Sequence, residues 1–416
     1  MATDNYRSQL EVEAERWSDH AEARQVKRSW MQSPLVLEHV NRRVTGDPNL
    51  DWLQWVNRNY LVETDRKRAL SLGCNDGNFE RQLVASGVVG ELLGIDISPR
   101  AIALAEAESN REGLTAHFEV GDVNTIRLEP GSYDVVFSVM AMHHFENLDH
   151  VLNEVSRALK PNGLLVLNEY VGASRFQWPE EQVSLANSVL KLIPPHWRQL
   201  RDGSIREVLI APPLDAIRQS DPFEAIRSAE IRSSISQWFQ VAAVLDYGGS
   251  ILHQVLHDIV HNFDETVEED RNLLRMLCGI EDLLLEQGCT ESDFTVIVAR
   301  KRSIDWTREP LDAEGVAATT SRMNPYFNDL AQRRIDRSLR TSSPCETQRS
   351  LDDAVARLAR MAEEMDKLDR ELADVRRHLR LVKRGKVLRL LNAAHGALKQ
   401  LGRAKTMFSR HDPPPR

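Results

Sequence analysis

The sequence has few cysteines and no long apolar run. Four cysteines occur in 416 residues, widely spaced and without a metal-type pair, which argues against a disulfide framework. No apolar run approaches the roughly 20 residues that span a bilayer. The first residues, MATDNYRSQLEVEAERW, are charged throughout, so we expect no secretion signal. Together these absences predict a reduced, cytoplasmic protein.

Acidic residues are in deficit only near the C-terminus. Residues 346–416 carry 17 Lys and Arg against 10 Asp and Glu, although the net charge of the whole chain is −9. The preceding residues are therefore strongly acidic, which argues against a nucleic-acid surface on them. We expect no nucleic-acid partner.

Residues 69–301 alternate apolar strands with amphipathic helices. Uninterrupted apolar strands followed by such helices are typical of a parallel sheet covered on both faces, so the predicted fold class is α/β and doubly wound. The predicted helices include residues 78–86, 99–112 and 148–160. The seven predicted strands are residues 69–73, 92–97, 117–122, 133–141, 163–171, 238–247 and 293–301.

The remaining segments surround this sheet domain. Residues 1–68 are predicted to form a helical N-terminal cap, with several tryptophans as anchors. Residues 173–230 are rich in proline and interrupt the strand–helix rhythm, and an insertion after a sheet strand often covers a site. Residues 302–350 are polar and irregular, which predicts a linker.

Residues 351–383 change to a heptad pattern. Apolar side chains there follow steps of three and four, which predicts a coiled coil; a single long helix packed on the body is the alternative. We expect a homo-oligomer through this coiled coil, although the seam does not select two strands over three. Residues 384–416 form a predicted basic amphipathic tail. The seam consists of Leu351, Ala354, Leu358, Met361, Met365, Leu368, Leu372, Val375, Leu379 and Val382.

The stretch ALSLGCNDGNFE predicts a ligand-binding loop between a strand and a helix. Gly73 and Gly77 let a ligand approach the backbone, and Asn75 tolerates a positive φ. The helix that follows directs unpaired N–H groups at the same place. Asp96 ends the next strand, where a carboxylate accepts hydrogen bonds from both ribose hydroxyls. These two signals predict an adenosine-type ligand, and a nicotinamide cofactor would produce them as well.

Two further motifs separate these ligands. Gly121-Asp122-Val123 follows the third strand, and the fourth strand runs YDVVFSVMAMHHF. With the loop and Asp96, they resemble the class I S-adenosylmethionine-dependent methyltransferases, strongly over residues 65–172 and more weakly over 231–301. In that family the acidic position two residues before the first glycine is often Asp or Glu, whereas Ser71 stands here, and Asn75 replaces a glycine.

The resemblance implies a seven-stranded Rossmann-like methyltransferase domain over residues 69–301, with S-adenosylmethionine as the cofactor and S-adenosylhomocysteine as its product. It implies that the first loop holds the methionine part, Asp96 the ribose, and Asp122 with Val123 the adenine. The cofactor-binding residues that it implies are Gly73, Cys74, Asn75, Gly77, Asp96, Ile97, Asp122, Val123, Ser138 and Met140.

Candidate catalytic residues end the fourth and fifth strands. His143 and His144 can take the proton of an acceptor hydroxyl, and a structural or cofactor-contacting role is the alternative. Glu169 and Tyr170 are comparable candidates. We predict no metal site.

Three histidines recur at steps of four residues, and several imidazoles together can bind a metal. His253, His257 and His261 share one face of a predicted helix, but four-residue steps spread them over two turns. We therefore expect them at a pocket edge or on the surface.

The segments DYGGSILHQVLHDIVHNF and NEYVGASRFQWP resemble methyltransferases of bacterial surface-polysaccharide (O-antigen) gene clusters. This implies an enzyme that O-methylates a sugar of a lipid-linked polysaccharide or its precursor. The domain order resembles that of chain-terminating enzymes. The basic tail would suit a glycosyltransferase or the inner-membrane surface, giving a peripheral location. The alternatives are a methyltransferase of small natural products and a non-catalytic interaction scaffold.

Overall fold

The computed structural model describes residues 2–22, 29–61 and 67–302. The predicted coiled coil and basic tail, and the predicted linker beyond residue 302, lie outside these residues.

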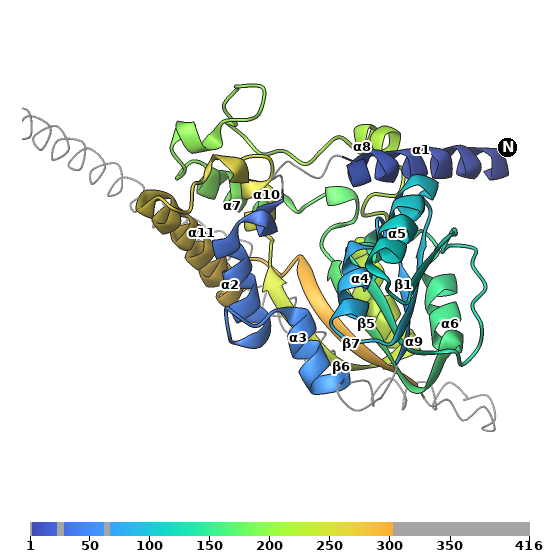
Figure 1. The fold of residues 1–416 in the computed structure, drawn as a ribbon. Helices are drawn as coiled ribbons and strands as arrows, with labels where there is room; N and C mark the ends of the chain where they lie inside the picture. Colours follow the sequence, from blue (N-terminus) through green and yellow to red (C-terminus); the bar gives the residue numbers. More distant parts are fainter. Residues whose placement is uncertain (1, 23–28, 62–66, 303–416) are drawn as a thin grey trace, which may run out of the picture. The chain divides into compact units, whose positions relative to one another are not determined.

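One seven-stranded sheet organises the described chain (Figure 1). Its strand order is β3-β2-β1-β4-β5-β7-β6. The strands are β1 (Arg68–Leu72), β2 (Glu91–Asp96), β3 (Ala116–Val120), β4 (Tyr133–Val139), β5 (Leu159–Tyr170), β6 (Phe239–Gly248) and β7 (Phe294–Lys301). All seven predicted strands are therefore present, within a few residues of their expected ends.

The sheet is mixed, so the prediction of a wholly parallel sheet was wrong for one strand. β7 runs antiparallel to both β5 and β6, whereas the pairs among β1 to β5 are parallel. Residues 294–299 of β7 are all buried, as in a central parallel strand. The apolar pattern therefore shows that β7 is covered on both faces, but it does not show its direction.

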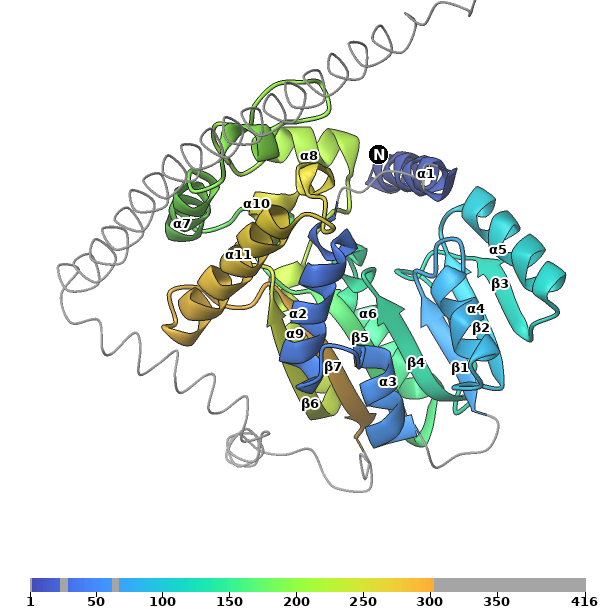
Figure 2. The same cartoon turned by 60° about the vertical axis from the view of Figure 1, so that its left-hand side comes forward.

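Helices cover both faces of the sheet (Figures 1 and 2). α4 and α5 pack on β2 and β3, while α6 and α9 pack together on the opposite face. The α-helices that follow β1 are α4 (Asn78–Ala85), α5 (Pro99–Glu112), α6 (Leu148–Ala158), α7 (Glu180–Leu190), α8 (Leu214–Ser220), α9 (Ile231–Trp238), α10 (Leu252–Leu256) and α11 (Glu268–Glu286).

Local signals explain why α5 begins and ends where it does. The Ser98 hydroxyl accepts a hydrogen bond from the backbone N–H of Ala101, and Pro99 occupies the first turn. Gly113 ends the helix with φ 67°, a left-handed conformation that glycine adopts without strain. The helix therefore follows directly from the carboxyl end of β2, and Asp96 lies at that junction.

The N-terminal residues are helical, as expected for the predicted cap. They form α1 (Ala2–Glu22), α2 (Pro34–Thr45) and α3 (Trp52–Val56), followed by a π-helical turn over Asn57–Leu61. Trp30 is buried against Tyr247 and Phe294, and Trp52 stacks on Phe79. α2 packs on β6 and α11, and α1 contacts α5 (Figure 1). Among the described residues, no helix is long and apolar enough to cross a membrane.

The single helix predicted to carry His253, His257 and His261 does not form. α10 ends at Leu256, and Asp258 adopts φ 56° before the next short helical turn. His253 is half-buried among aromatic rings, whereas His257 is exposed. These histidines therefore do not share a face, and they lie outside the cavity described below.

Candidate functional site

A cavity of about 410 Å³ lies at the carboxyl ends of the central strands. The loops after β1, β2, β3 and β4 supply most of its lining, and α1 and the insertion supply the rest. This edge of an open α/β sheet is where ligands bind. Eight of the ten predicted cofactor-binding residues line it: Gly73, Cys74, Asn75, Asp96, Ile97, Asp122, Val123 and Met140.

The loop after β1 needs its two glycines. Gly73 has φ +74°, and a Cβ there would lie 2.4 Å from the Cβ of Ala141. Gly77 has φ +67°, and a Cβ there would lie 2.5 Å from the ring of Phe118. Gly77 thus supports the loop from behind rather than lining the cavity. Asn75 adopts φ 47° and turns the backbone as a glycine would.

Asp96 holds the loops after β1 and β2 together. Its Oδ2 accepts a hydrogen bond from the backbone N–H of Asn75 at 2.8 Å, and its Oδ1 accepts one from Ser98 at 2.9 Å. Burial raises the pKa of Asp96. Each carboxylate oxygen has a second lone pair, so the fixed side chain can still accept from a diol in the cavity.

Asp122 is held in the loop that follows β3. Its Oδ1 accepts a hydrogen bond from the backbone N–H of Asn124 at 2.9 Å. Its Oδ2 accepts one from the hydroxyl of Tyr6, on α1, also at 2.9 Å. Burial and then the Asp122 carboxylate raise the pKa of Tyr6. α1 therefore reaches the position that the sequence assigns to adenine recognition.

Glu80, on α4, brings a further carboxylate to the cavity. The hydroxyl of Ser71 donates to its Oε1 at 2.6 Å, and burial raises the pKa of Glu80 to about 7. Ser71 stands where an acid was expected from the resemblance. The following helix, α4, supplies a carboxylate beside that position, and no motif in the sequence marks Glu80 for this role.

The cavity residues fit the cofactor that the sequence implies. Asn75 Oδ1 and Glu80 Oε2 are buried without a hydrogen-bond partner among the described residues. Buried polar atoms of this kind are normally satisfied, so a ligand with several donors is expected here. S-adenosylmethionine carries an ammonium group and two ribose hydroxyls, which are such donors.

Two predicted cofactor residues lie at or just after the end of β4, and only one of them lines the cavity. Ser138 is fully buried within the strand and does not line the cavity. Met140 lines it, adopts φ 52°, and donates its backbone N–H to the carbonyl of Asn168 at 2.8 Å. The chain thus turns sharply at Met140 before the short 3₁₀ helix η3 (Met142–His144).

Glu169 and His143 form a buried pair behind the cavity. Glu169 is fully buried and accepts hydrogen bonds from the backbone N–H groups of Ala141 at 3.0 Å and Met142 at 2.6 Å. Its other oxygen contacts Nδ1 of His143. Burial alone lowers the pKa of His143, but Glu169 and the neighbouring carboxylates raise it to about 9. The two predicted catalytic residues are therefore brought together.

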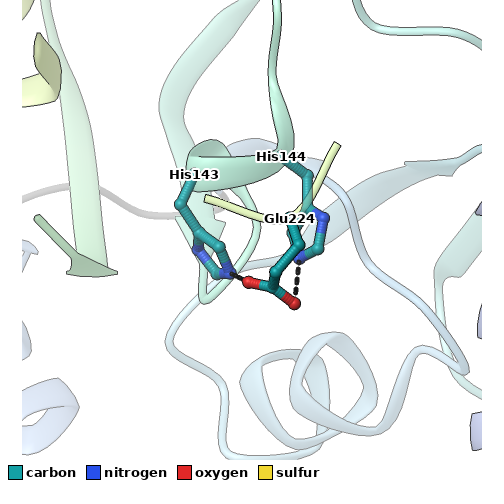
Figure 3. A group of neighbouring side chains, drawn as sticks. All are labelled: His143, His144 and Glu224. Carbon is teal, nitrogen blue, oxygen red and sulfur yellow. Dashed lines mark ion pairs between the residues drawn. The ribbon is translucent and has the colours of Figure 1, made fainter. Parts of the chain in front are cut away.

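His144 lies at the cavity itself. Its Nδ1 is 3.0 Å from Oε1 of Glu13 on α1, and its ring packs edge-on against Trp17. Burial and then the neighbouring His143 lower the pKa of His144 to about 4. On the other side, Glu224 faces both imidazoles (Figure 3).

The insertion supplies the acidic residues beside these histidines. Asp221 and Glu224 follow α8, and Phe223 between them lines the cavity. Arg175 donates to the backbone carbonyls of Asp221 at 3.5 Å and Glu224 at 3.3 Å, which fixes this turn. Burial and then the nearby Glu13 raise the pKa of Asp221 to about 6. The insertion thus contributes to the lining of the cavity.

Tyr170 is not brought to the cavity. It is 2% exposed, packs against Phe176, His253 and Phe294, and donates its hydroxyl to the carbonyl of Ala173 at 3.0 Å. Its ring also lies edge-on to that of His143, with the centroids 6.1 Å apart, but Tyr170 does not line the cavity. Its aromatic contacts assign it a packing role.

Comparison with known proteins gives one family. Residues 70–167 match the family described as a methyltransferase domain. Phthiotriol/phenolphthiotriol dimycocerosates methyltransferase 1 of Mycobacterium ulcerans is 30% identical over 149 residues, which are 36% of this chain and 54% of that protein. A ubiquinone biosynthesis O-methyltransferase of Burkholderia vietnamiensis is 33% identical over 98 residues, 23% of this chain and 41% of that protein. The chain thus spans about half, or less, of the relatives that it matches.

Solved structures give a similar result at low identity. An S-adenosylmethionine-dependent methyltransferase from Mesorhizobium loti is 18% identical, with a TM-score of 0.36 over 60% of this chain and 97% of that one. Haemonchus contortus phosphoethanolamine N-methyltransferase 2, in complex with S-adenosyl-L-methionine, is 15% identical, with a TM-score of 0.38 over 69% of this chain and 60% of that one. At these scores the likeness adds nothing to what the strand order itself shows.

Proposed function

We propose that the whole chain is a class I S-adenosylmethionine-dependent methyltransferase that transfers a methyl group to a hydroxyl oxygen of its acceptor, because residues 70–167 match a methyltransferase domain. One observation carries this proposal. His144 and Glu13 line the same cavity as Asp96 and Asp122, so proton acceptors lie beside the predicted cofactor position.

The residues of the chain have separate parts in this reaction. S-adenosylmethionine supplies a methyl group activated by a sulfonium. Asp96 and the loop after β1 would hold the cofactor, while the neighbouring α1 and insertion would orient the acceptor. The hydroxyl proton would pass to the His144–Glu13 pair as the new O–C bond forms. Glu169 would keep His143, and with it η3, in place.

For the acceptor, we propose a sugar hydroxyl of a lipid-linked polysaccharide or its precursor. The resemblance of residues 168–179 and 246–263 to enzymes of surface-polysaccharide clusters supports this class. The predicted basic tail supports a lipid-linked acceptor, because basic amphipathic segments bind anionic membrane surfaces. Chain termination is a further proposal that rests on domain order alone.

A second acceptor class has its own support. The matched relatives include a ubiquinone biosynthesis O-methyltransferase and a fatty-acid O-methyltransferase of Mycolicibacterium smegmatis. A small or lipidic hydroxyl or carboxyl compound is therefore the competing proposal. Incubation with labelled S-adenosylmethionine and separate panels of nucleotide sugars, lipid-linked glycans and quinone precursors would distinguish the two.

Calorimetry with S-adenosylhomocysteine tests the cofactor site directly. We expect binding by the wild-type chain and a loss of about 1–3 kcal/mol in binding free energy for Asp96→Ala, because charged hydrogen bonds to the ribose disappear. Asp215→Ala is the matched control, since Asp215 is exposed on α8. No binding by the wild type, or equal binding by Asp96→Ala, would favour the non-catalytic scaffold.

A further inference from the structure

Two histidines and one glutamate converge beside the acceptor side of the cavity (Figure 3). We propose that His143, His144 and Glu224 bind a first-row divalent cation such as Zn²⁺. Binding of the cation stands on the geometry of these side chains. Its role toward an acceptor hydroxyl rests on the proposed function.

The spacing of the three side chains suits a metal centre. Nε2 of His143 is 3.5 Å from Oε1 of Glu224, and Nε2 of His144 is 4.0 Å from Oε2. Ligand atoms about 2.1 Å from a tetrahedral Zn²⁺ are about 3.4 Å apart, so small movements would complete the set. Two histidines and one glutamate also form a known ligand set of catalytic zinc sites.

Each imidazole has a carboxylate beside its Nδ1. Nδ1 of His143 contacts Glu169, and Nδ1 of His144 is 3.0 Å from Oε1 of Glu13. The hydrogen bond to Glu169 fixes the tautomer of His143 that leaves Nε2 free to bind metal, whereas Glu13 lies close to Nδ1 of His144 without an aligned hydrogen bond. Both rings therefore present Nε2 to the same carboxylate, that of Glu224 (Figure 3).

His144 also lacks hydrogen bonds. It is 9% exposed, and neither of its ring nitrogens has a hydrogen-bond partner among the described residues. A buried imidazole normally has such a partner, so its free nitrogen needs an explanation. A cation at Nε2 would provide one.

The charge around the cluster favours a cation. Four carboxylates meet there, from Glu13, Glu169, Asp221 and Glu224, and Arg16 pairs with Asp221 at 2.7 Å. Buried negative charges are costly unless positive charge offsets them. A divalent ion would contribute that charge at the centre of the group.

A second set, Glu13, His144 and Asp221, is less suitable for the metal. Oδ2 of Asp221 already pairs with Nε of Arg16, and Oε1 of Glu13 accepts a hydrogen bond from Nε1 of Trp17 at 2.8 Å. These two carboxylates are therefore assigned to supporting His144 rather than to the ion.

The fourth position of the ion would be open to the cavity, because His144 lines it. A water or an acceptor hydroxyl bound there would lose its proton more easily. With Nε2 of His144 on the ion, the nearby Glu13 carboxylate would take that proton.

Metal binding by the full-length chain tests the proposal without any acceptor. The protein is treated with a chelator, freed of it, and titrated with Zn²⁺ against a chromophoric competitor. We expect one equivalent to bind, and at least about tenfold weaker binding for Glu224→Gln and His144→Asn. His257→Asn is the matched control, because His257 is an exposed histidine paired with Asp258, and it should bind as the wild type does. Co²⁺ should give visible bands of low-coordinate geometry without a thiolate charge-transfer band.

Three results would overturn the site: a wild type without a stoichiometric Zn²⁺ equivalent, Glu224→Gln binding as tightly as wild type, or a thiolate band. Circular dichroism melts show whether each variant is folded. If a variant does not fold, the number of Zn²⁺ equivalents that the wild type binds still tests the site. S-adenosylhomocysteine calorimetry on the same samples separates the two proposals. If the protein binds S-adenosylhomocysteine but not Zn²⁺, only the cation site is overturned. If it binds Zn²⁺ but not S-adenosylhomocysteine, the methyltransferase proposal is overturned and the cation site is supported.

Discussion

Glu80 shows how a single side chain can restore a feature that a motif lacks. Serine stands at position 71, where an acidic residue is expected, and its hydroxyl donates a hydrogen bond to Glu80 on the next helix, α4. Within the described part of the chain, Oε2 of Glu80 is buried at the cavity without a hydrogen-bond partner. We therefore expect it to accept from the ammonium group of the cofactor.

This assignment predicts a pH dependence of cofactor binding. Burial raises the pKa of Glu80 to about 7, so the carboxyl is protonated below that pH. Pairing with an ammonium requires the ionised form. We expect the affinity for S-adenosylhomocysteine to fall as pH decreases through about 7, by up to about tenfold per pH unit. Calorimetry between pH 5.5 and 8 measures this.

Two variants are the controls for that measurement. Glu80→Gln should bind more weakly at pH 8 and lose the dependence, because the amide does not titrate. The Ser71 hydroxyl lowers the pKa of Glu80 by hydrogen bonding, so Ser71→Ala should move the transition to higher pH. An unchanged slope in Glu80→Gln would assign the dependence to another group.

At the scale of elements, α1 connects the cofactor side of the cavity to the insertion. Tyr6 donates to Asp122, and Arg16, ten residues later on the same helix, contacts the insertion through Asp221 and the carbonyl of Ser220. Between them, Leu10 and Glu13 line the cavity. One helix face thus joins two segments that are far apart in the sequence.

The Arg16–Asp221 pair can be tested by its effect on stability. Asp221 is 2% exposed, so Arg16→Ala would leave a buried carboxylate without its cation. We expect Arg16→Ala to lower the free energy of unfolding by about 1–3 kcal/mol in urea titrations, since Arg16 itself is partly exposed. The double variant with Asp221→Asn should recover most of that loss. If the double variant loses as much free energy of unfolding as Arg16→Ala and Asp221→Asn lose together, the ion pair does not stabilise the fold.

The sheet elements and the cofactor edge follow from local sequence, whereas the opposite side of the cavity does not. Apolar runs and turn residues predicted every strand, and the glycine-containing loop after β1 predicted the cofactor edge. Tyr6, Glu13 and Glu224 were missed because they come from segments more than 70 residues from the motifs they meet. A helical pattern in α1 says which face is apolar, but it does not say where the helix docks.

The errors also have physical reasons. Glu169 and Tyr170 both contact His143, but the Tyr170 hydroxyl donates to the carbonyl of Ala173 and Tyr170 does not line the cavity; the order of residues at the end of β5 does not predict this. The histidine series from 253 was placed on one helix because its spacing is helical, but the chain turns at Asp258. Spacing predicts a shared face only where the helix is continuous.

At the scale of the whole molecule, the basic tail is the untested part of the proposal. The sequence predicts a cationic amphipathic segment, which anionic lipids attract by about 1 kcal/mol for each basic residue near the surface. We expect the full-length chain to float with vesicles that contain anionic lipid. A full-length variant with glutamine at Lys386, Arg389, Lys399, Arg403 and Lys405 should float less.

Vesicles of neutral lipid are the control for this flotation assay, together with the wild type at high salt, which screens the attraction. Equal recovery of both proteins on anionic vesicles would remove the membrane proposal. A protein partner such as a glycosyltransferase would then be the remaining candidate for the tail.

The origin of the cavity walls has a consequence for the diversity of related enzymes. Residues 70–167, which match the shared domain, supply the cradle, while α1 and the turn around Phe223 supply the opposite side. Two proteins could therefore keep the same cradle and recognise unlike substrates by exchanging only these outer pieces. Grafting them between relatives is a rational route to altered selectivity, and redesign of the central strands is not.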